Sequence, residues 1–146
     1  MVDREVVLRR LRQVDRRVGA IREIAVRSQA AFLSDKGLQA ATERHLQVAI
    51  QATIDIALHV LAEDSAQTPD DYGSAFVLLA QEGAIPGTLA ERLRSAAGLR
   101  NILVHAYLDV DPRQLLLHLD DVDDLTEFAR HIESYISKET DQPEGS

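Results

Sequence analysis

The chain has 146 residues, of which 45% are hydrophobic and 4% aromatic, with no cysteine and a formal net charge of −8 at pH 7. This length fits one domain, and the lack of cysteine excludes disulfide bonds and thiolate metal ligands. Because no apolar run approaches the length of a membrane span and no charged-then-apolar leader is visible, we expect a soluble, cytoplasmic protein with no membrane association.

The first half of the chain predicts two long helices. Apolar residues recur every three or four positions over residues 7–32, which indicates a helix of roughly eight turns with Asp3 as its cap. The sequence Ser-Asp-Lys-Gly at residues 34–37 breaks this pattern. A second helix is expected over residues 38–63, and its apolar residues on several faces predict that it is the most buried one.

Three further helices are expected in the second half. The pair Thr68–Pro69 is a helix-start signal, a capping hydroxyl followed by proline, for a short helix that ends near residue 82. A fourth helix is predicted over residues 89–108 and is stopped by the segment 109–112, because a residue before proline resists helical geometry. A fifth helix with one apolar face is predicted over residues 112–137.

These five segments define the expected fold. Strand signals, repeats and glycine-rich phosphate loops are missing from the sequence. The predicted fold class is all-α, an up-and-down antiparallel bundle with a four-helix core and one additional helix. We expect one helical domain over residues 1–138 and a flexible polar tail over residues 139–146.

A charged residue interrupts the apolar stripe of the fourth helix. The stripe has alternating spacings of four and three and consists of Leu89, Leu93, Ala96, Arg100, Leu103 and Tyr107. An arginine is always charged, and leaving it alone in a dry core costs several kcal/mol. We therefore expect Arg100 to face a cleft or a subunit boundary.

Asn101 and His105 accompany Arg100 in this segment. On an ideal helix Asn101 and His105 share one face, and Arg100 nearly eclipses Tyr107. Arg100 and His105, however, diverge by roughly 140°. The two side chains can contact the same ligand only if the arginine side chain swings round, the helix is distorted, or a second copy of the site completes the first.

The motif of this segment starts with Arg100 and a polar residue, and after three further residues it continues with His105, one more residue and Tyr107. This order resembles the signature of HEPN domains. It is most similar to the HepT-like toxins, which are encoded beside a minimal nucleotidyltransferase antitoxin. Residues 43–57 and 69–76 are also similar to stretches of that family, and the resemblance extends to about Ser137. It implies a HEPN-like bundle and an endoribonuclease toxin of a type VII toxin-antitoxin system, with tRNA or mRNA as its target.

The polar side chains of the motif suit RNA cleavage without a metal or another cofactor. Such cleavage needs a base for the ribose 2′-hydroxyl, positive charge for the phosphorane, and an acid for the departing 5′ oxygen. Histidine can act as base or acid, and the arginine fork matches phosphate oxygens. We predict His105 as general base or acid, Arg100 as stabiliser of the transition state, and Asn101 as the group that orients His105 or the phosphate.

One histidine cannot readily be base and acid in the same step. A two-fold homodimer that joins two copies of the motif would supply the missing group and give Arg100 a solvent-open cleft. The resemblance implies the same arrangement, because HEPN nucleases are described as dimers with composite sites. It also implies products with 2′,3′-cyclic phosphate and 5′-hydroxyl ends.

Tyr107 has two interpretations. A tyrosine in a helical seam usually belongs to the core, with its hydroxyl at the edge. The resemblance implies instead that Tyr107 is the residue to which the antitoxin attaches AMP. The added charge and volume beside Arg100 and His105 would then exclude an RNA phosphate.

Charge is distributed unevenly along the chain. Residues 1–30 hold eight arginines and four acids, a net charge of +4, whereas residues 109–146 hold eleven acids and three bases. The arginines of the first helix could form a phosphate-facing strip, or a solvated face that pairs with acids of the tail or of another subunit. These residues are Arg9, Arg10, Arg12, Arg16 and Arg17, and Arg92 and Arg94 add charge just before the motif.

Metal binding is not expected. Asp55 with His59, and Glu127 with His131, have one-turn spacing, but two ligands make a poor site and helix salt bridges are the commoner use of such pairs.

Two other functions stay open. The chain could be a non-catalytic helical module that assembles with a nucleotidyltransferase, or a nucleotide-binding domain that holds a phosphate without cleaving it. The nucleotide-binding domain would use the same Arg100 and His105 on the phosphate. As separate alternatives for single residues, Arg100 could be an interface salt-bridge residue and Asn101 an ordinary solvent-facing one.

Overall fold

The computed structural model describes residues 2–105 and 110–141, and for residues 139–141 the backbone alone. Within these ranges every regular element is a helix, which confirms the predicted all-α fold class. The elements are α1 (Arg4–Ala25), α2 (Gln29–Leu33), α3 (Lys36–Asp64), α4 (Tyr72–Gln81), α5 (Gly87–Val104), α6 (Pro112–His118), the 3-10 turn η1 (Leu119–Asp121) and α7 (Val122–Asp141).

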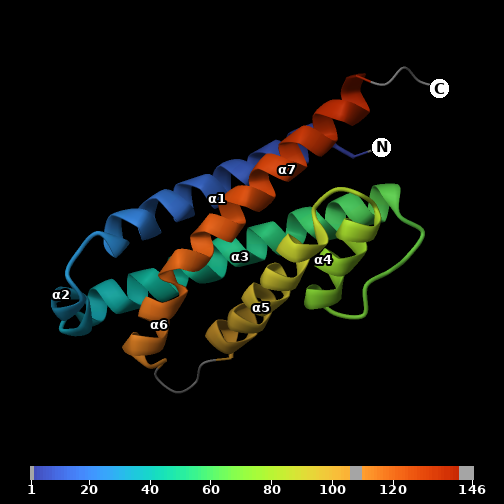
Figure 1. Ribbon diagram of the computed structural model, residues 1–146. Helices are drawn as coiled ribbons and strands as arrows, with labels where there is room; N and C mark the ends of the chain where they lie inside the picture. Colours follow the sequence, from blue (N-terminus) through green and yellow to red (C-terminus); the bar gives the residue numbers. More distant parts are fainter. Residues whose placement is uncertain (1, 106–109, 142–146) are drawn as a thin grey trace.

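The four long helices α1, α3, α5 and α7 form a bundle, and α4 is the additional helix beside it (Figure 1). α1 packs along α3, α4 pairs with α5, and α7 contacts both α1 and α5. The short helices α2 and α6 contact each other at one end of the bundle (Figure 1). This is the predicted arrangement of four core helices with one addition.

α3 is the central helix, as its apolar residues on several faces predict. It contacts each of the other six α-helices, and Leu46, Ile54 and Val60 are completely buried. Among the described helices it is the one with the length and apolar character to cross a membrane. Its burial inside the bundle accounts for that composition, because a helix surrounded by others is apolar on most sides.

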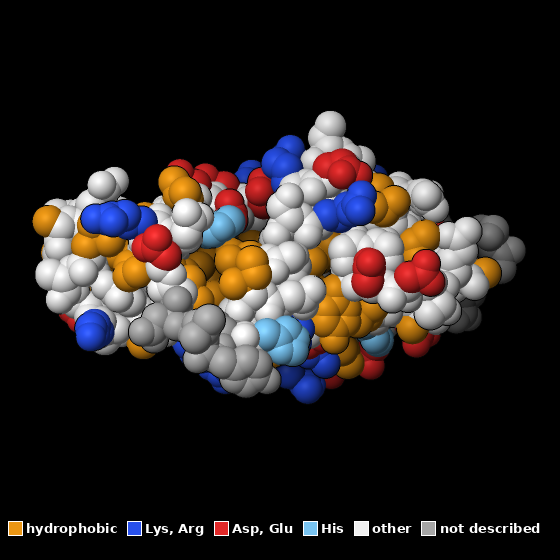
Figure 2. Space-filling view, turned by 90° about the horizontal axis from the view of Figure 1, so that it is seen from below, with side chains coloured by type: hydrophobic (Ala, Val, Ile, Leu, Met, Phe, Trp, Pro, Cys, Tyr) orange, Lys and Arg blue, Asp and Glu red, His pale blue; other side chains and the backbone are white. Residues whose placement is uncertain are grey.

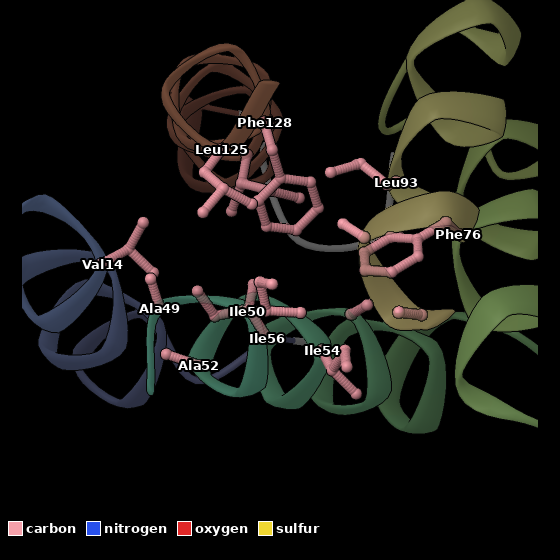
Figure 3. Close-up of a cluster of buried hydrophobic side chains, with 14 of the residues drawn as sticks. Val14, Ala49, Ile50, Ala52, Ile54, Ile56, Phe76, Leu93, Leu125 and Phe128 are labelled. Atoms are coloured by element: carbon pink, nitrogen blue, oxygen red, sulfur yellow. The ribbon is translucent and has the colours of Figure 1, made fainter. Parts of the chain in front are cut away.

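The core is built from branched and aromatic side chains that join the helices (Figure 3). Phe76 of α4 and Phe128 of α7 meet edge to face with ring centroids 5.9 Å apart, and both rings are fully buried. Between α1 and α3, Val14 lies opposite Ala49 (Figure 3). Burying one large apolar side chain contributes about 1.5–3 kcal/mol. These contacts therefore stabilise the packing of α4 against α7 and of α1 against α3.

The first predicted helix is divided in two. α1 ends at Ala25, and α2 begins after Ser28, whose Oγ accepts a hydrogen bond of 3.1 Å from the backbone N–H of Ala31. A serine side chain that caps a new helix competes with continuation of the old one. The prediction of one unbroken helix to Phe32 is therefore wrong.

α4 begins later than the pair Thr68–Pro69 predicts. The Oδ1 atom of Asp71 accepts from the Ser74 backbone N–H at 2.7 Å, and the Ser74 hydroxyl oxygen accepts from the Asp71 backbone N–H at 3.1 Å. This reciprocal capping box satisfies two backbone donors and starts the helix at Tyr72. The same hydrogen bond from the Ser74 backbone is the main reason that the pKa of Asp71 is lowered.

α5 ends before the motif is complete. Its last residue is Val104, and His105 caps its C-terminus with a backbone hydrogen bond of 3.1 Å to the Asn101 carbonyl oxygen. Ile102 and Val104 are 60% and 36% exposed, so further turns would gain little packing. The expected helix through His105 is therefore wrong, and the predicted end at residue 108 lies outside the described residues.

The last predicted helix is also divided, because η1 separates α6 from α7. His118 Nδ1 and Asp121 Oδ2 lie 2.7 Å apart across this break. The backbone of α7 is helical to Asp141, and residues 142–146 lie outside the described residues. The domain boundary at 138 and the flexible tail 139–146 stay predictions.

Candidate functional site

Arg100 lies where three helices meet, and its side chain is half-buried. Its Nε donates a hydrogen bond of 2.6 Å to the side-chain oxygen of Gln51 on α3. The guanidinium carbon lies 5.1 Å from the ring centre of Tyr72 on α4, a distance at which the ring face attracts a cation. Arg100 thus sits at the rim of the core, as its charge requires.

A series of polar contacts continues from Arg100 to α1. The amide nitrogen of Gln51 donates to Asp55 Oδ1 at 2.9 Å, and Arg10 Nη1 donates to Asp55 Oδ2 at 3.3 Å. The carboxylate of this series is therefore paired with Arg10, while Arg100 bonds to a neutral amide. Among the residues that the structure describes, no carboxylate lies within ion-pair distance of Arg100, which leaves its positive charge available to an anion.

Asn101 is exposed, and its side-chain oxygen accepts a hydrogen bond of 3.1 Å from Nη1 of Arg100. The bond that joins Asn101 to His105 is the backbone bond at the helix end. The described contacts of Asn101 therefore orient Arg100 rather than the imidazole of His105.

His105 is exposed at the end of α5, one position beyond the helix. The angle of roughly 140° expected between Arg100 and His105 applies to a continuous helix, and the helix does not continue. His105 nevertheless keeps the backbone hydrogen bond of 3.1 Å to Asn101, so the end of the helix does not by itself decide among the three alternatives, and they stay predictions. Tyr107 lies outside the described residues.

Exposed apolar side chains lie near the end of α5 and on α6. Ile102 is 60% and Val104 is 36% exposed, and Leu117 on α6 is 70% exposed. Figure 2 shows apolar side chains gathered over the middle of the face seen from below, between charged groups at its edges. Apolar surface of this kind beside a polar motif is typical of an interaction surface.

The arginines that precede the motif are paired and therefore differ from Arg100. Arg92 binds Asp124 and Glu127 of α7, each at 2.8 Å, and the hydrogen bond to Asp124 is the main cause of its raised pKa. Arg94 lies 3.6 Å from Glu91. Arg92 and Arg94 thus fit the interpretation of a solvated face that pairs with acids.

The one-turn pairs considered as metal ligands make other contacts. His59 Nε2 accepts from the Asp3 backbone at 3.1 Å, and Glu127 lies 4.0 Å from His131 while it also binds Arg92. Within residues 2–105 and 110–141, no three acidic or histidine side chains are placed to hold a metal ion.

Sequence reasoning did not single out Gln51 or Tyr72, although both contact Arg100. A signal was present, because Gln51 and Asp55 are two polar residues one turn apart in a stretch, residues 48–58, that is otherwise apolar except for Thr53. The role of Tyr72 could be found only once the start of α4 was placed correctly. That start depends on the capping box of Asp71 and Ser74.

The chain is similar to known proteins over most of its length. The sequence profile of the family described as "Ribonuclease HepT-like" matches residues 14–132. A protein of Aphanizomenon flos-aquae named "tRNA nuclease HepT" is 34% identical over 72% of this chain and 72% of its own. A protein of Shewanella oneidensis named "mRNA nuclease HepT" is 30% identical over 80% of this chain and 90% of its own.

A solved structure has the same fold. It is the tri-AMPylated HEPN toxin of Shewanella oneidensis in complex with the MNT antitoxin, and it superposes with a TM-score of 0.81 and 26% sequence identity. The match covers 90% of this chain and 99% of that one.

Proposed function

The chain belongs to the HepT-like ribonuclease family, and from this premise we propose that it is a metal-independent endoribonuclease toxin. Its active site would combine Arg100, Asn101 and His105 from two chains. The observation that carries the proposal is the state of Arg100. Its guanidinium is fixed by Gln51 and Tyr72, has no carboxylate partner among the described residues, and lies in the same motif as an exposed histidine.

The reaction follows from the chemistry of RNA. One His105 takes the proton of the ribose 2′-hydroxyl, and the 2′ oxygen forms a bond to the adjacent phosphorus. The bond from phosphorus to the 5′ oxygen breaks, and that oxygen receives a proton from the second histidine. The products carry 2′,3′-cyclic phosphate and 5′-hydroxyl ends. Arg100 neutralises the charge that develops on the phosphorane oxygens, and Asn101 holds Arg100 in place.

A homodimer supplies the second histidine. The exposed Ile102 and Val104 lie within the motif, between Asn101 and His105, and a second copy of the chain would bury them. A two-fold axis beside this surface brings the same residues together from both chains, as an isologous interface requires. The apolar contacts then stabilise the dimer and the polar groups form the shared site.

The substrate is RNA, and the partner is a minimal nucleotidyltransferase antitoxin. The relatives are named as nucleases of tRNA and of mRNA, and the toxin of the similar solved structure is bound to an MNT antitoxin. A site made of phosphate-binding groups fits both kinds of RNA, because these groups carry no base specificity. We place the protein in the cytoplasm, where such substrates are found.

Neutralisation would occur by AMPylation of Tyr107. The toxin of the similar solved structure is AMPylated, and Tyr107 is the motif tyrosine of this chain. Its phenol oxygen would attack the α-phosphate of ATP, releasing pyrophosphate and leaving an aryl phosphodiester. The added negative charge two positions from His105 would repel an RNA phosphate.

Cleavage of RNA by the purified chain tests the proposed function. The wild type should cut single-stranded RNA in the presence of a metal chelator and leave the ends given above. Arg100→Ala and His105→Ala should each lower the rate by about a hundredfold or more, which is the range of such groups in other enzymes. His131→Ala, at a distant histidine of α7, serves as the matched control. Intact RNA with the wild type, or chelator-sensitive cleavage, would reject the proposal.

A further inference from the structure

α1 and α3 run side by side (Figure 1). A groove lies between them, beside the candidate site. It consists of two adjoining hollows of about 220 and 240 Å³ that share Gln13. The residues of this groove that matter here are Gln13, Arg16, Arg17, Arg44, His45 and Gln51.

The arginines of the groove differ from Arg10 and Arg22 of the basic first helix, which are paired with carboxylates. Arg22 is paired with Asp123 of α7 at 2.9 Å, as expected of a solvated face that meets acidic residues. Within the described part of the chain, no carboxylate lies within ion-pair distance of Arg16, Arg17 or Arg44. Three cations thus line one groove of a chain whose net charge is −8.

The other groups of the groove are neutral or neutralised. Gln13 and Gln51 offer amides, and Asp55, the one acid of the lining, is paired with Arg10. His45 Nδ1 lies 3.0 Å from Nη1 of Arg17, and partial burial is the main cause of the lowered pKa of His45. At neutral pH the imidazole is therefore uncharged and can accept a hydrogen bond from Arg17. Such a lining favours an anion that also takes hydrogen bonds.

The groove is continuous with the candidate site. Gln51 lines the groove and also accepts the hydrogen bond of Arg100. The contacts Arg10 to Asp55 and Arg17 to His45 mark its two ends, since α1 and α3 run in opposite directions. The seven-residue step from Arg10 to Arg17 covers about 10 Å at 1.5 Å per residue. An extended anion that starts at Arg100 would therefore pass Arg44 and reach Arg17.

We propose that this groove binds the sugar-phosphate backbone of the RNA substrate on one side of the scissile bond. The inference rests on the proposed function, because it takes RNA to be the substrate. Arg16, Arg17 and Arg44 bind phosphates, while Gln13 and Gln51 bond to phosphate or sugar oxygens. The contacts carry no base specificity and instead set how far the substrate extends beyond the cut.

Binding of RNA and cleavage of a long and a short RNA test the inference. In the non-cleaving His105→Ala chain, we measure the affinity for single-stranded RNA and the salt dependence of that affinity. The measurement is made with and without the double substitution Arg16→Gln plus Arg44→Gln, which we call the groove pair. The matched control is Arg113→Gln plus Arg130→Gln, which removes the same charge from exposed positions of α6 and α7. The groove pair should lower the affinity about tenfold or more, about 1.4 kcal/mol for each factor of ten. It should also reduce the slope of log K against log salt by about 0.7 for each phosphate that the variant no longer binds.

In the chain with an intact His105, the groove pair should slow cleavage of a long RNA and leave cleavage of a dinucleotide unchanged. If the groove pair and the control pair have equal affinity and equal salt slope, and cleavage is intact, the proposal that the groove binds RNA is rejected. The proposed function is then not affected. A groove pair that changes the oligomeric state, measured by sedimentation, would make the groove a protein interface and also overturn it. If the wild type neither binds nor cuts RNA, both the groove proposal and the proposed function are rejected.

Discussion

The side-chain oxygen of Gln51 accepts a hydrogen bond of 2.6 Å from Nε of Arg100, while its amide nitrogen donates to Asp55 at 2.9 Å. Gln51 therefore fixes Arg100 without neutralising it. We predict that Gln51→Leu lowers kcat for RNA about ten- to a hundredfold, because a hydrogen bond to a charged group contributes about 1.5–3 kcal/mol. Steady-state kinetics of RNA cleavage measures this.

The control for Gln51 is Gln81→Leu, at an exposed position of α4. It removes the same amide and should leave kcat unchanged. An unaltered kcat for Gln51→Leu in a folded chain would show that Arg100 needs no support from α3.

Tyr72 supports Arg100 through its ring, 5.1 Å from the guanidinium. Tyr72→Phe keeps the ring and should retain activity. Tyr72→Leu removes the ring face and should lower the rate about two- to fivefold, since such a contact at a partly exposed site contributes about 0.5–1 kcal/mol. Equal rates for the two variants would contradict a role of the ring.

The fold depends on the edge-to-face contact of Phe76 and Phe128. We predict that Phe128→Ala lowers the free energy of unfolding by about 3–5 kcal/mol, because it opens a cavity between α4 and α7. Val26→Ala, at a side chain that is 85% exposed, should change it by about 0.5 kcal/mol or less. Chemical denaturation followed by circular dichroism distinguishes the two, and similar losses would contradict the core described above.

The pKa of His45 is lowered from its ordinary value of 6.5, first by burial and then by the charge of Arg17. The unfolded chain therefore binds more protons than the folded chain just below pH 6.5. The stability that neutral His45 contributes is present above this pH and is lost as the pH falls. Wild type should lose more unfolding free energy than His45→Gln between about pH 7 and about pH 5. Parallel stability curves for the two chains would refute this.

AMPylation of Tyr107 can be followed by mass spectrometry. Wild type incubated with ATP and a minimal nucleotidyltransferase antitoxin should gain the mass of AMP and lose RNA cleavage. Tyr107→Phe should gain no mass at this position, while Tyr72→Phe, which alters the tyrosine under Arg100, should be modified as wild type is. Full labelling of Tyr107→Phe would place the modification on another residue.

Most of the architecture could be predicted from the sequence, because it follows from apolar periodicity. The spacing of apolar residues predicts five helical segments and the central place of α3. The breaks could not be predicted in the same way. Ser28 acts through one hydrogen bond, which competes with a periodic pattern that continues to Phe32. The capping box of Asp71 and Ser74 acts through two hydrogen bonds and starts α4 later than the pair Thr68–Pro69 predicts.

The site was predictable in part. The sequence singles out Arg100, Asn101 and His105, because a charged residue in an apolar seam is unusual. The resemblance to the HEPN family then explains these residues as a candidate RNA-cleaving site. α5 ends at Val104, where Val104 and His105 are both exposed, and the apolar periodicity of the sequence does not predict this end. Gln51 and Tyr72 reach Arg100 from α3 and α4, so their roles follow only from the tertiary structure.

Mixing wild type with His105→Ala chains tests the composite site most directly. If each cleavage needs a histidine from both chains, a mixed dimer is inactive, and activity falls as the square of the wild-type fraction. After exchange of subunits in an equal mixture, about a quarter of the activity should remain. A linear fall, with about half of the activity left, would mean that each chain acts alone and would contradict the shared site.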